Sequence, residues 1–563
     1  MTLMTSTTLL RGLCVAFGVA TAVTTLAQCG KRVDDAGVYE TTVEVDAVGT
    51  VAAREDDAGV DPRPGSTPRV VATAGDEPRT STAPASGGAA AAASDHAAST
   101  EIAAAERAGG STPANVAASI AAAPELPAPP DALRILISGS MLGRLEPCGC
   151  ASGQLGGLAR RIQHIGEQRD YDLLLEGGDM VAGKTELDKL KLLTAAQVLF
   201  AMEHTYDALG VGLKDLALPL EEWSGFLLGG PAVATNLTCD DPMWPATPYR
   251  DKQVRDHSIR IASLLIDELP QSLRGEDARV RRTSPTTAWS DAFAGADDDV
   301  IRVALVHGRD DRIRAVIPEL QPKPDLVVGV DPGYIEPDSS AALVAGVPLV
   351  FAGIRGRVLL DVRLWRDGDA ARVACDLVPL AGSKTVPGGG GDPNVKAFLL
   401  THREDVAREN VLEQMAEQHP TPSGSTYVGS QTCSGCHPSA MAAWKKSKHS
   451  HAWQTLVDAE NDPSRYGWPV TKYPDCVGCH VIGYGQKTGF VSYEKTPHLS
   501  DVGCERCHGP GLDHVMSGGQ KPLGIIGGIT PSIMCTQCHD YEQSPDFVYG
   551  DRWQVIKHGK EPK

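Results

Sequence analysis

The 563-residue sequence has few aromatic side chains, a deficit of basic residues and few long apolar runs. Lysine and arginine number 52 against 71 acidic residues, which gives a formal net charge of −19. Nucleic-acid-binding proteins normally carry a basic excess, so the charge argues against that class. A disulfide framework is also disfavoured, because eight of the 14 cysteines fall into four copies of one five-residue pattern. The length exceeds what one hydrophobic core supports, so we expect several domains.

The first thirty residues have the features of an export signal. Residues 12–23 form an uncharged, mostly apolar run, too short to span a bilayer but typical of a signal peptide. Leu26-Ala27-Gln28-Cys29 follows and resembles the bacterial lipoprotein signal. This resemblance implies a signal peptide over residues 1–28, lipidation of Cys29 and a periplasmic or cell-surface protein held on a membrane. Secretion with soluble release is the alternative. The sequence has no second long apolar run that would indicate a membrane-spanning protein.

Residues 29–130 are rich in Ala, Thr, Ser, Pro, Gly and Asp and contain almost no Leu, Ile, Phe or Trp. Such a segment has too little apolar surface to offset the entropy of ordering. We therefore expect a disordered linker, which as a flexible coil would span roughly 50–60 Å. The alternative is a short alanine-rich helix around residues 117–123.

Residues 131–385 have the pattern of an α/β layered fold. Short apolar runs predict strands at 133–137, 172–175, 300–306, 325–328, 348–352 and 358–365. Between them, Leu158, Ile162 and Ile165 recur at helical spacing, and residues 186–202 predict a long helix. Strands that alternate with helices indicate an α/β fold.

Within residues 132–380 the order of motifs resembles the metallophosphoesterase domain of bacterial 5′-nucleotidase-type proteins. The similar segments are 143–150, 155–161, 177–179 and 352–357. Active members of that family hold two metal ions with Asp, His and Asn side chains, and the metals supply the attacking hydroxide. The resemblance thus implies an α/β metallophosphoesterase-like sandwich.

Most of the metal ligands that this resemblance implies are missing. Only Asp179 and His307 stand at matching places. The other places hold different residues: Ser140 and Leu142 at the first motif, Leu213 and Lys214 at the Asn-His pair, and residues 329–332 at the last motif. Two ligands cannot hold a two-metal site, so we expect a catalytically inactive scaffold or binding module.

Cys148 and Cys150 lie in one of the similar segments, and their role stays open. They could form a redox thiol pair, a metal site together with Cys239, or simply packed thiols. Residues 386–425 are predicted to be a linker that begins with Gly and Pro and contains a short charged helix.

The C-terminal part, residues 426–563, contains the pattern Cys-x-x-Cys-His four times. The residues are Cys433, Cys436 and His437; Cys476, Cys479 and His480; Cys504, Cys507 and His508; and Cys535, Cys538 and His539. In c-type haem attachment, two thiols bind the porphyrin and the adjacent histidine is the proximal iron ligand. A zinc-ribbon interpretation explains paired cysteines but not a histidine after every pair. We therefore predict four covalently attached haems c.

Five further histidines in this part are candidates for the second axial position: His449, His451, His498, His514 and His558. A second histidine fills the sixth coordination position of the iron and favours electron transfer. An iron that lacks this ligand can bind a small molecule. Since there are five candidates for four irons, we expect at least three haems to have two histidine ligands.

The segment from about residue 427 to 514 resembles the tetrahaem cytochrome c-554 family. The resemblance is carried by residues 427–430, 444–449, 496–499 and 502–511 and by His514. Members of the family carry electrons between periplasmic redox enzymes, and one of their haems can be five-coordinate. The resemblance assigns His449, His498 and His514 to irons, whereas His451 and His558 do not match clearly. The second ligand of the fourth haem is left open.

These features favour an exported electron carrier that exchanges electrons with redox partner proteins, with the inactive phosphoesterase-like domain as a docking or positioning module. A haem enzyme that reduces or oxidises a small nitrogen or oxygen species is the alternative. A haem-linked phosphoesterase or nucleotide-binding module is the weakest hypothesis. Residues 426–563 have few large apolar side chains, so we also expect a mainly α-helical domain in which haem replaces much of the core.

Overall fold

A computed structural model describes residues 121–122, 127–147, 153–168, 170–201, 206–227, 230–270, 279–331, 333, 341–382, 390–421, 423–463, 466–523, 530–540 and 542–559. The predicted signal peptide, Cys29, most of the predicted linker, Cys148 and Cys150 lie outside these residues. Within the described parts of the chain, no helix has the length and apolar character needed to cross a membrane.

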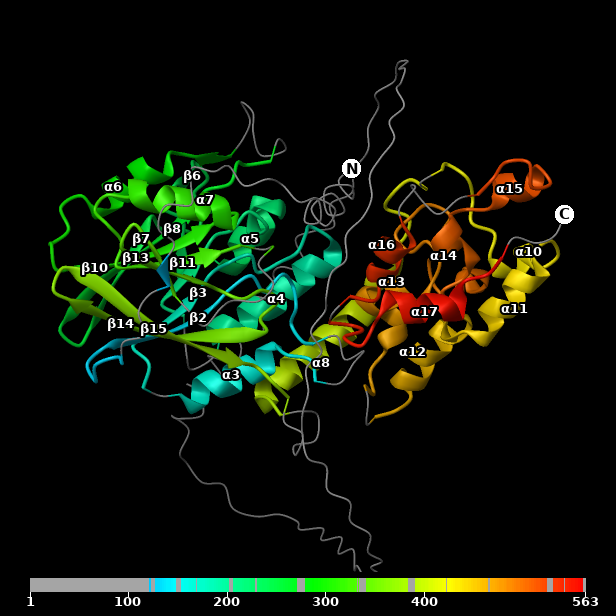
Figure 1. Cartoon of the computed structure of the whole chain (residues 1–563), viewed down its shortest axis with the longest axis horizontal. Coiled ribbons are helices and arrows are strands. Elements are labelled where there is room, and N and C mark those ends of the chain that lie inside the picture. The colour runs from blue at the N-terminus through cyan, green and yellow to red at the C-terminus, as the bar shows by residue number, and fades with distance from the viewer. Residues whose placement is uncertain are drawn as a thin grey trace, which may run out of the picture. The chain divides into compact units, whose positions relative to one another are not determined.

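Two β-sheets form the centre of the α/β region (Figure 1). The strand order of the larger sheet is β1-β12-β13-β11-β10-β8-β7, and that of the smaller sheet is β15-β14-β2-β3-β4-β5. The larger sheet consists of β1 (Ala121–Ala122), β7 (Tyr249–Val254), β8 (His257–Leu265), β10 (Ile301–His307), β11 (Leu326–Val330), β12 (Ala342–Val344) and β13 (Val347–Phe351). The smaller sheet consists of β2 (Leu133–Ser138), β3 (Leu173–Glu176), β4 (Ala208–Gly210), β5 (Ala232–Val233), β14 (Val358–Asp367) and β15 (Ala370–Pro379). Neighbouring strands from β2 to β5 are parallel, as are β8, β10, β11 and β13, whereas the remaining pairs are antiparallel.

The two sheets pack face to face over an apolar layer. Ile135 and Ile137 of the smaller sheet lie in one cluster with Ile259 and Val303 of the larger sheet. The intervening residue Leu136 points the other way and packs with helices, because side chains alternate along a strand. Both faces of β2 are therefore buried, which explains its continuous apolar sequence.

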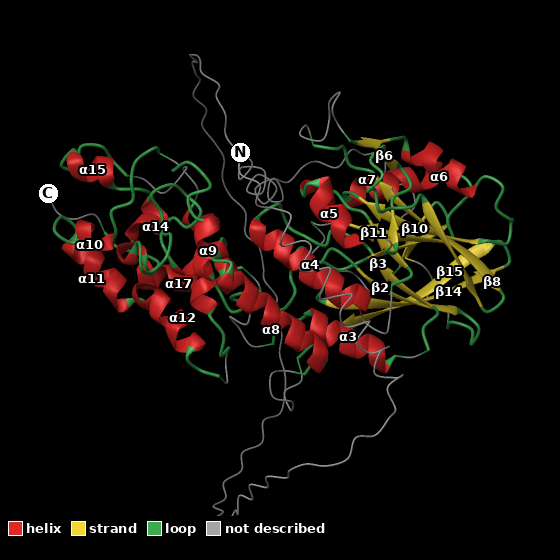
Figure 2. Cartoon of the chain, turned by 180° about the vertical axis from the view of Figure 1, so that it is seen from behind, coloured by secondary structure: helices red, strands yellow, loops and turns green. Residues whose placement is uncertain are grey.

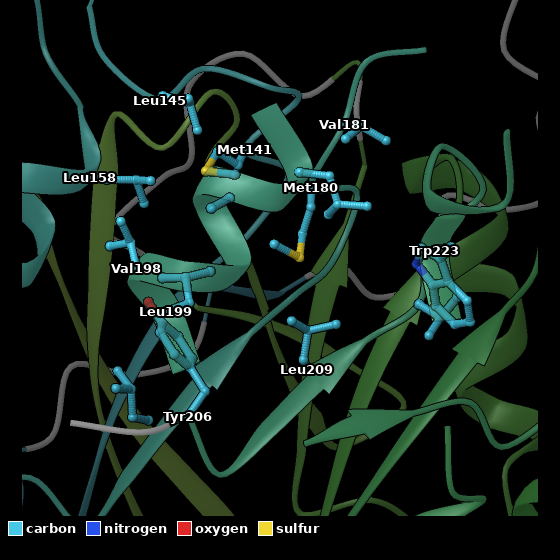
Figure 3. Packing of buried hydrophobic residues seen from close by; sticks show 14 of the residues in the cluster. Met141, Leu145, Leu158, Met180, Val181, Val198, Leu199, Tyr206, Leu209 and Trp223 are labelled. Carbon is cyan, nitrogen blue, oxygen red and sulfur yellow. The ribbon is translucent and has the colours of Figure 1, made fainter. Parts of the chain in front are cut away.

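Helices cover the outer faces of both sheets. On the smaller sheet lie α3 (Leu158–Glu167), α4 (Glu186–Ala201) and α8 (Pro393–Arg408), which share one apolar cluster with β2 and β3. Figure 3 shows part of this cluster, including Val198 and Leu199 of α4. On the larger sheet lie α6 (Pro285–Phe293) and α7 (Asp310–Val316). The predicted α/β sandwich is confirmed, and its layers run helix, sheet, sheet, helix.

The structure departs from the predicted linker boundary at residue 130. Ala121 and Ala122 pair antiparallel with Leu343 and Ala342 of β12. Strand pairing uses backbone groups, so it requires none of the large side chains whose scarcity led us to expect disorder here.

Helix α8 lies in the segment predicted as a linker. Asp392 caps it by accepting hydrogen bonds from the backbone N–H groups of Asn394 (2.9 Å) and Val395 (3.0 Å). Val395 and Leu399 belong to the core that covers the smaller sheet. Further along α8, Val406 packs with Val411 of the short helix α9 (Val411–Gln414). Helices α8 and α9 are thus an integral part of the packed structure.

The C-terminal part is mainly helical, as predicted (Figure 2). Its helices are α10 (Ser430–Cys433), α11 (Pro438–Lys446), α12 (Ala452–Glu460), α13 (Pro474–His480), α14 (Cys504–His508), α15 (Leu512–Met516), α16 (Pro531–Thr536) and α17 (Tyr549–Ile556). Trp453, Trp468, Val477 and Phe490 are buried in one cluster. The protein's own apolar core around α12 and α13 is therefore larger than we expected from composition.

Candidate haem-binding site

Each Cys-x-x-Cys-His motif lies on a short helical turn. In the first and the fourth motif, the N–H of the histidine donates to the carbonyl of the first cysteine at 2.9 Å. The second and third motifs lie on α13 and α14. Residues at positions i, i+3 and i+4 share one helix face, so both sulfurs and the imidazole of each motif are on the same side.

The four motifs contact one another in an order that differs from the chain order. Cys433 of the first motif hydrogen-bonds Cys504 of the third, which lowers the pKa of the Cys504 thiol to about 6. Cys479 of the second motif hydrogen-bonds Cys538 of the fourth and lowers its pKa to about 6. Arg506 in the third motif donates to Sγ of Cys538 at 3.5 Å. The spatial order is therefore first, third, fourth, second.

Three of the motif histidines each face a second imidazole. The ring centres of His437 and His514 are 6.0 Å apart, those of His539 and His449 6.1 Å, and those of His508 and His558 5.9 Å. A nitrogen ligand lies about 2 Å from a metal and its ring centre about 1 Å farther out, so two imidazoles on one metal are roughly 6 Å apart. The separations in these three pairs match that of two imidazoles on one iron.

Hydrogen bonds fix the orientation of several of these rings. Nδ1 of His514 lies 2.7 Å from the carbonyl of Lys521, and Nδ1 of His539 lies 2.9 Å from Oγ of Ser544. Nδ1 of His480 lies 2.6 Å from the carbonyl of Ala452. An N–H donated to a carbonyl at Nδ1 leaves Nε2 as the basic nitrogen, which is the arrangement common for metal-binding histidines.

His480 of the second motif has no second imidazole across from it among the described residues. The two remaining candidates, His451 and His498, are exposed. His451 lies with Nδ1 2.8 Å from Oγ of Ser450. His498, which the family resemblance assigns to an iron, packs its backbone against Gly429. The geometry thus pairs His449, His514 and His558 with motif histidines and leaves His451 and His498 apart.

Glu505, between the cysteines of the third motif, was not among the predicted site residues. Its side chain is buried and accepts backbone N–H groups from Val428 (3.0 Å), Gly429 (2.7 Å) and Gly511 (2.7 Å). Burial raises its pKa, and these donors oppose that shift. The sequence does contain a signal for this role, namely an acidic residue inside a motif that is followed by Gly-Pro-Gly. A carboxylate easily reaches the backbone N–H groups of glycine.

A cavity lies beside the second motif. Its lining includes Cys476, Tyr466, Trp468, Arg403 of α8 and Lys191 of α4. The guanidinium carbon of Arg403 is 4.5 Å from the ring centre of Trp468, and Nζ of Lys191 is 2.6 Å from Asp475. The attachment helix α13 is therefore held against helices of the α/β region.

Asp179 and His307, the two residues that match the metallophosphoesterase resemblance, are buried in the α/β region. Oδ1 of Asp179 accepts the backbone N–H of Lys214 at 2.9 Å, and burial raises the pKa of Asp179 to about 6. His307 is buried with neither ring nitrogen hydrogen-bonded, and burial lowers its pKa to about 3. Within the described residues, no three His, Cys, Asp or Glu side chains are grouped so as to hold a metal ion.

The C-terminal part matches the family model of cytochrome c554 and c-prime over residues 432–509. It is 35% identical over 146 residues to cytochrome c-554 of Nitrosomonas europaea, an alignment that covers 21% of this chain and 60% of the relative. The resemblance of this part to the family is confirmed, and it implies covalently bound haem c.

Solved structures similar to the chain include phosphoesterases. The 5′-nucleotidase precursor from Thermus thermophilus has a TM-score of 0.38 and 17% identity over 53% of this chain and 62% of that protein. A calcineurin-like phosphoesterase from Bacillus subtilis has a TM-score of 0.37 and 15% identity over 48% of this chain and 97% of that protein. The chain spans less than two thirds of the cytochrome c-554 and of the 5′-nucleotidase precursor that it matches.

Proposed function

We propose that this protein is an exported cytochrome with four haems c that carries electrons between redox partner proteins outside the cytoplasm. The observation that carries the proposal is the set of three imidazole pairs, each with ring centres 5.9–6.1 Å apart and each containing a motif histidine. Iron with two imidazole ligands exchanges electrons with little rearrangement, because neither ligand has to leave.

We assign the axial ligands from these pairs. The first motif uses His437 and His514, the third uses His508 and His558, and the fourth uses His539 and His449. The second motif supplies only His480. Contacts between motifs support a route that runs first, third, fourth, second, so that charge passes between neighbouring porphyrins over short distances.

The α/β region serves in this proposal as an inactive positioning module. Ser140 and Leu142 stand where the first metal-binding motif would need an Asp and a His, and Lys214 replaces another ligand. The contacts of Arg403 with Trp468 and of Lys191 with Asp475, which directly precedes the second motif, support a role in holding the haem-binding part.

We also propose export with lipid attachment at Cys29. Haem is joined to Cys-x-x-Cys-His motifs outside the cytoplasm, which agrees with the signal-like N-terminus. A membrane-attached carrier would then reach its partners through the predicted linker.

Carbon monoxide binding to the reduced protein tests the ligand assignment, because it reports irons that lack a second ligand. Purified protein should contain four haems and bind about one CO per chain, at the second motif. His514→Ala, His558→Ala and His449→Ala should each raise this to about two. The matched controls His498→Ala and His451→Ala should leave it unchanged, and an additional CO site in His498→Ala would overturn the assignment.

A second candidate function follows from the unpaired His480. An iron with one protein ligand can bind a small nitrogen or oxygen species, and the cavity beside Cys476 adjoins that motif. If this is the function, the wild-type protein should convert such a species, and the rate should rise with the number of CO molecules that each chain can bind. Electron transfer without turnover favours the carrier.

A further inference from the structure

A group of exposed cations lies on two helices of the C-terminal part and on the residues that follow them. Lys445 and Lys446 end α11, Lys448 follows, Arg552 lies on α17 and Lys557 follows α17. Helices α11 and α17 contact each other. Among the described residues, none of these five cations has an ion-pair partner. We call this group the basic surface.

The basic surface adjoins two of the three imidazole pairs. Lys448 directly precedes His449, whose ring is paired with His539. Lys557 directly precedes His558, whose ring is paired with His508. Arg552 lies on α17, which contacts α11 and ends two residues before His558. The surface therefore lies beside the third and fourth motifs, in the middle of the spatial order.

The concentration of positive charge is local. Residues 426–563 contain equal numbers of basic and acidic side chains, 13 of each, and the whole chain is at −19. Among the described residues, the acidic side chains nearest to Arg552 in sequence are Asp551 and Asp546, and both are exposed. Within the described part of the chain, five cations against these two carboxylates give this surface a net positive charge.

We propose that the basic surface docks the acidic face of a redox partner protein and is the port through which that partner exchanges electrons with the third and fourth haems. The proposal rests on the proposed electron-carrier function. Complementary charge raises association rates by orders of magnitude, and weak electron-transfer complexes use small interfaces.

Stopped-flow kinetics with the whole haem-loaded protein tests this proposal, using a reduced plant-type ferredoxin as an acidic donor. The test variant carries Lys445→Gln, Lys446→Gln and Lys448→Gln. The control variant removes the same charge from exposed lysines elsewhere, with Lys472→Gln, Lys487→Gln and Lys495→Gln. At low salt we expect the test variant to react about tenfold more slowly than wild type and with a flatter salt dependence. The control should stay within about twofold of wild type.

Three results would overturn the proposal. Equal rates in the test and control variants would show that the partner does not use this surface. Midpoint potentials that shift without any change in salt dependence would show that the lysines serve the haem propionates. Loss of binding to phosphatidylglycerol vesicles, with unchanged ferredoxin kinetics, would show that the surface contacts lipid. Haem content and CO binding, measured on the same samples, report separately on the proposed function.

Discussion

At the scale of single residues, the third motif depends on a side chain that binds neither haem nor iron. Glu505 occupies a variable position of the motif, yet both of its oxygens accept backbone N–H groups. Two donors come from residues 428 and 429, just before the first motif, and the third comes from residue 511. One carboxylate thus ties the start of the haem-binding part to the third attachment turn.

We predict that Glu505→Gln destabilises the haem-loaded protein by about 2 kcal/mol, because the new amide N–H faces buried N–H donors. Thermal unfolding followed through haem absorbance measures the change. Thr536 occupies the corresponding position of the fourth motif and is exposed, so Thr536→Ala is the matched control and should change little. Equal losses in both variants would contradict the role assigned to Glu505.

At the scale of elements, helix α8 connects the α/β region to the haem-binding part through one buried histidine, His402. Oγ1 of Thr194 on α4 donates to the carbonyl of Leu190 at 2.9 Å, so it accepts from Nδ1 of His402, 3.0 Å away. Nε2 of His402 then accepts the hydroxyl of Tyr473 at 3.1 Å. The imidazole is therefore neutral and has a partner on each side.

We predict that His402 makes the protein sensitive to acid. Burial and then the charge of Lys191 lower its pKa to about 4, whereas the unfolded chain titrates near 6.5. Between these values the unfolded state binds more protons, so the free energy of unfolding falls as pH falls, by up to about 3 kcal/mol. Above pH about 6.5 this contribution is fully present.

Denaturant unfolding at pH 7.5 and pH 4.5 measures this effect. In His402→Gln, the loss of stability between the two pH values should be smaller than in the wild type. His257, which is exposed, provides the control variant His257→Gln with an unchanged pH dependence. A wild-type loss that His402→Gln does not reduce would contradict the prediction.

Elements with strong local patterns were predictable from the sequence, and elements that depend on distant partners were not. The apolar runs at 133–137 and 300–306 correspond to β2 and β10, because strands buried on both faces are continuously apolar. Strand β8 was missed although Ile259 and Ile261 alternate with polar residues. Helix α8 was predicted only as a short charged helix in a linker, since its burial depends on α3 and α4.

The same distinction holds for the candidate site. The attachment residues are predicted from local spacing alone, because each motif is five consecutive residues. The second imidazoles come from distant parts of the chain, and family resemblance assigned His498 while leaving His558 unmatched. Ring geometry pairs His558 with His508 instead. Pairing across the fold is a property of packing, which sequence spacing does not encode.

At the scale of the whole molecule, ion pairs join the residues that follow the fourth motif to the α/β region. Arg355 lies 2.9 Å from a carboxylate oxygen of Glu542, and the side chain of Gln154 donates to the backbone carbonyl of Glu542 at 2.6 Å. The backbone N–H of Arg355 in turn donates to the carbonyl of Ser140 at 2.6 Å. Glu542 is therefore connected through Arg355 to Ser140, which follows β2.

We predict that Glu542→Arg loosens this contact and that Arg355→Glu in the same chain restores it, because the swap re-forms an opposite-charge pair. Hydrogen exchange of residues 153–157 and 352–357 should rise in the single variant and return toward wild type in the double variant. Each partly exposed pair stabilises the contact by only about 1 kcal/mol, so exchange is a better measure than the melting temperature. Glu494→Arg, at an exposed position outside this contact, is the control. If the double variant exchanged as fast as Glu542→Arg, attraction between these two charges could not be what holds this contact, and the other contacts of the haem-binding part with the α/β region, such as that of Lys191 with Asp475, would have to hold it.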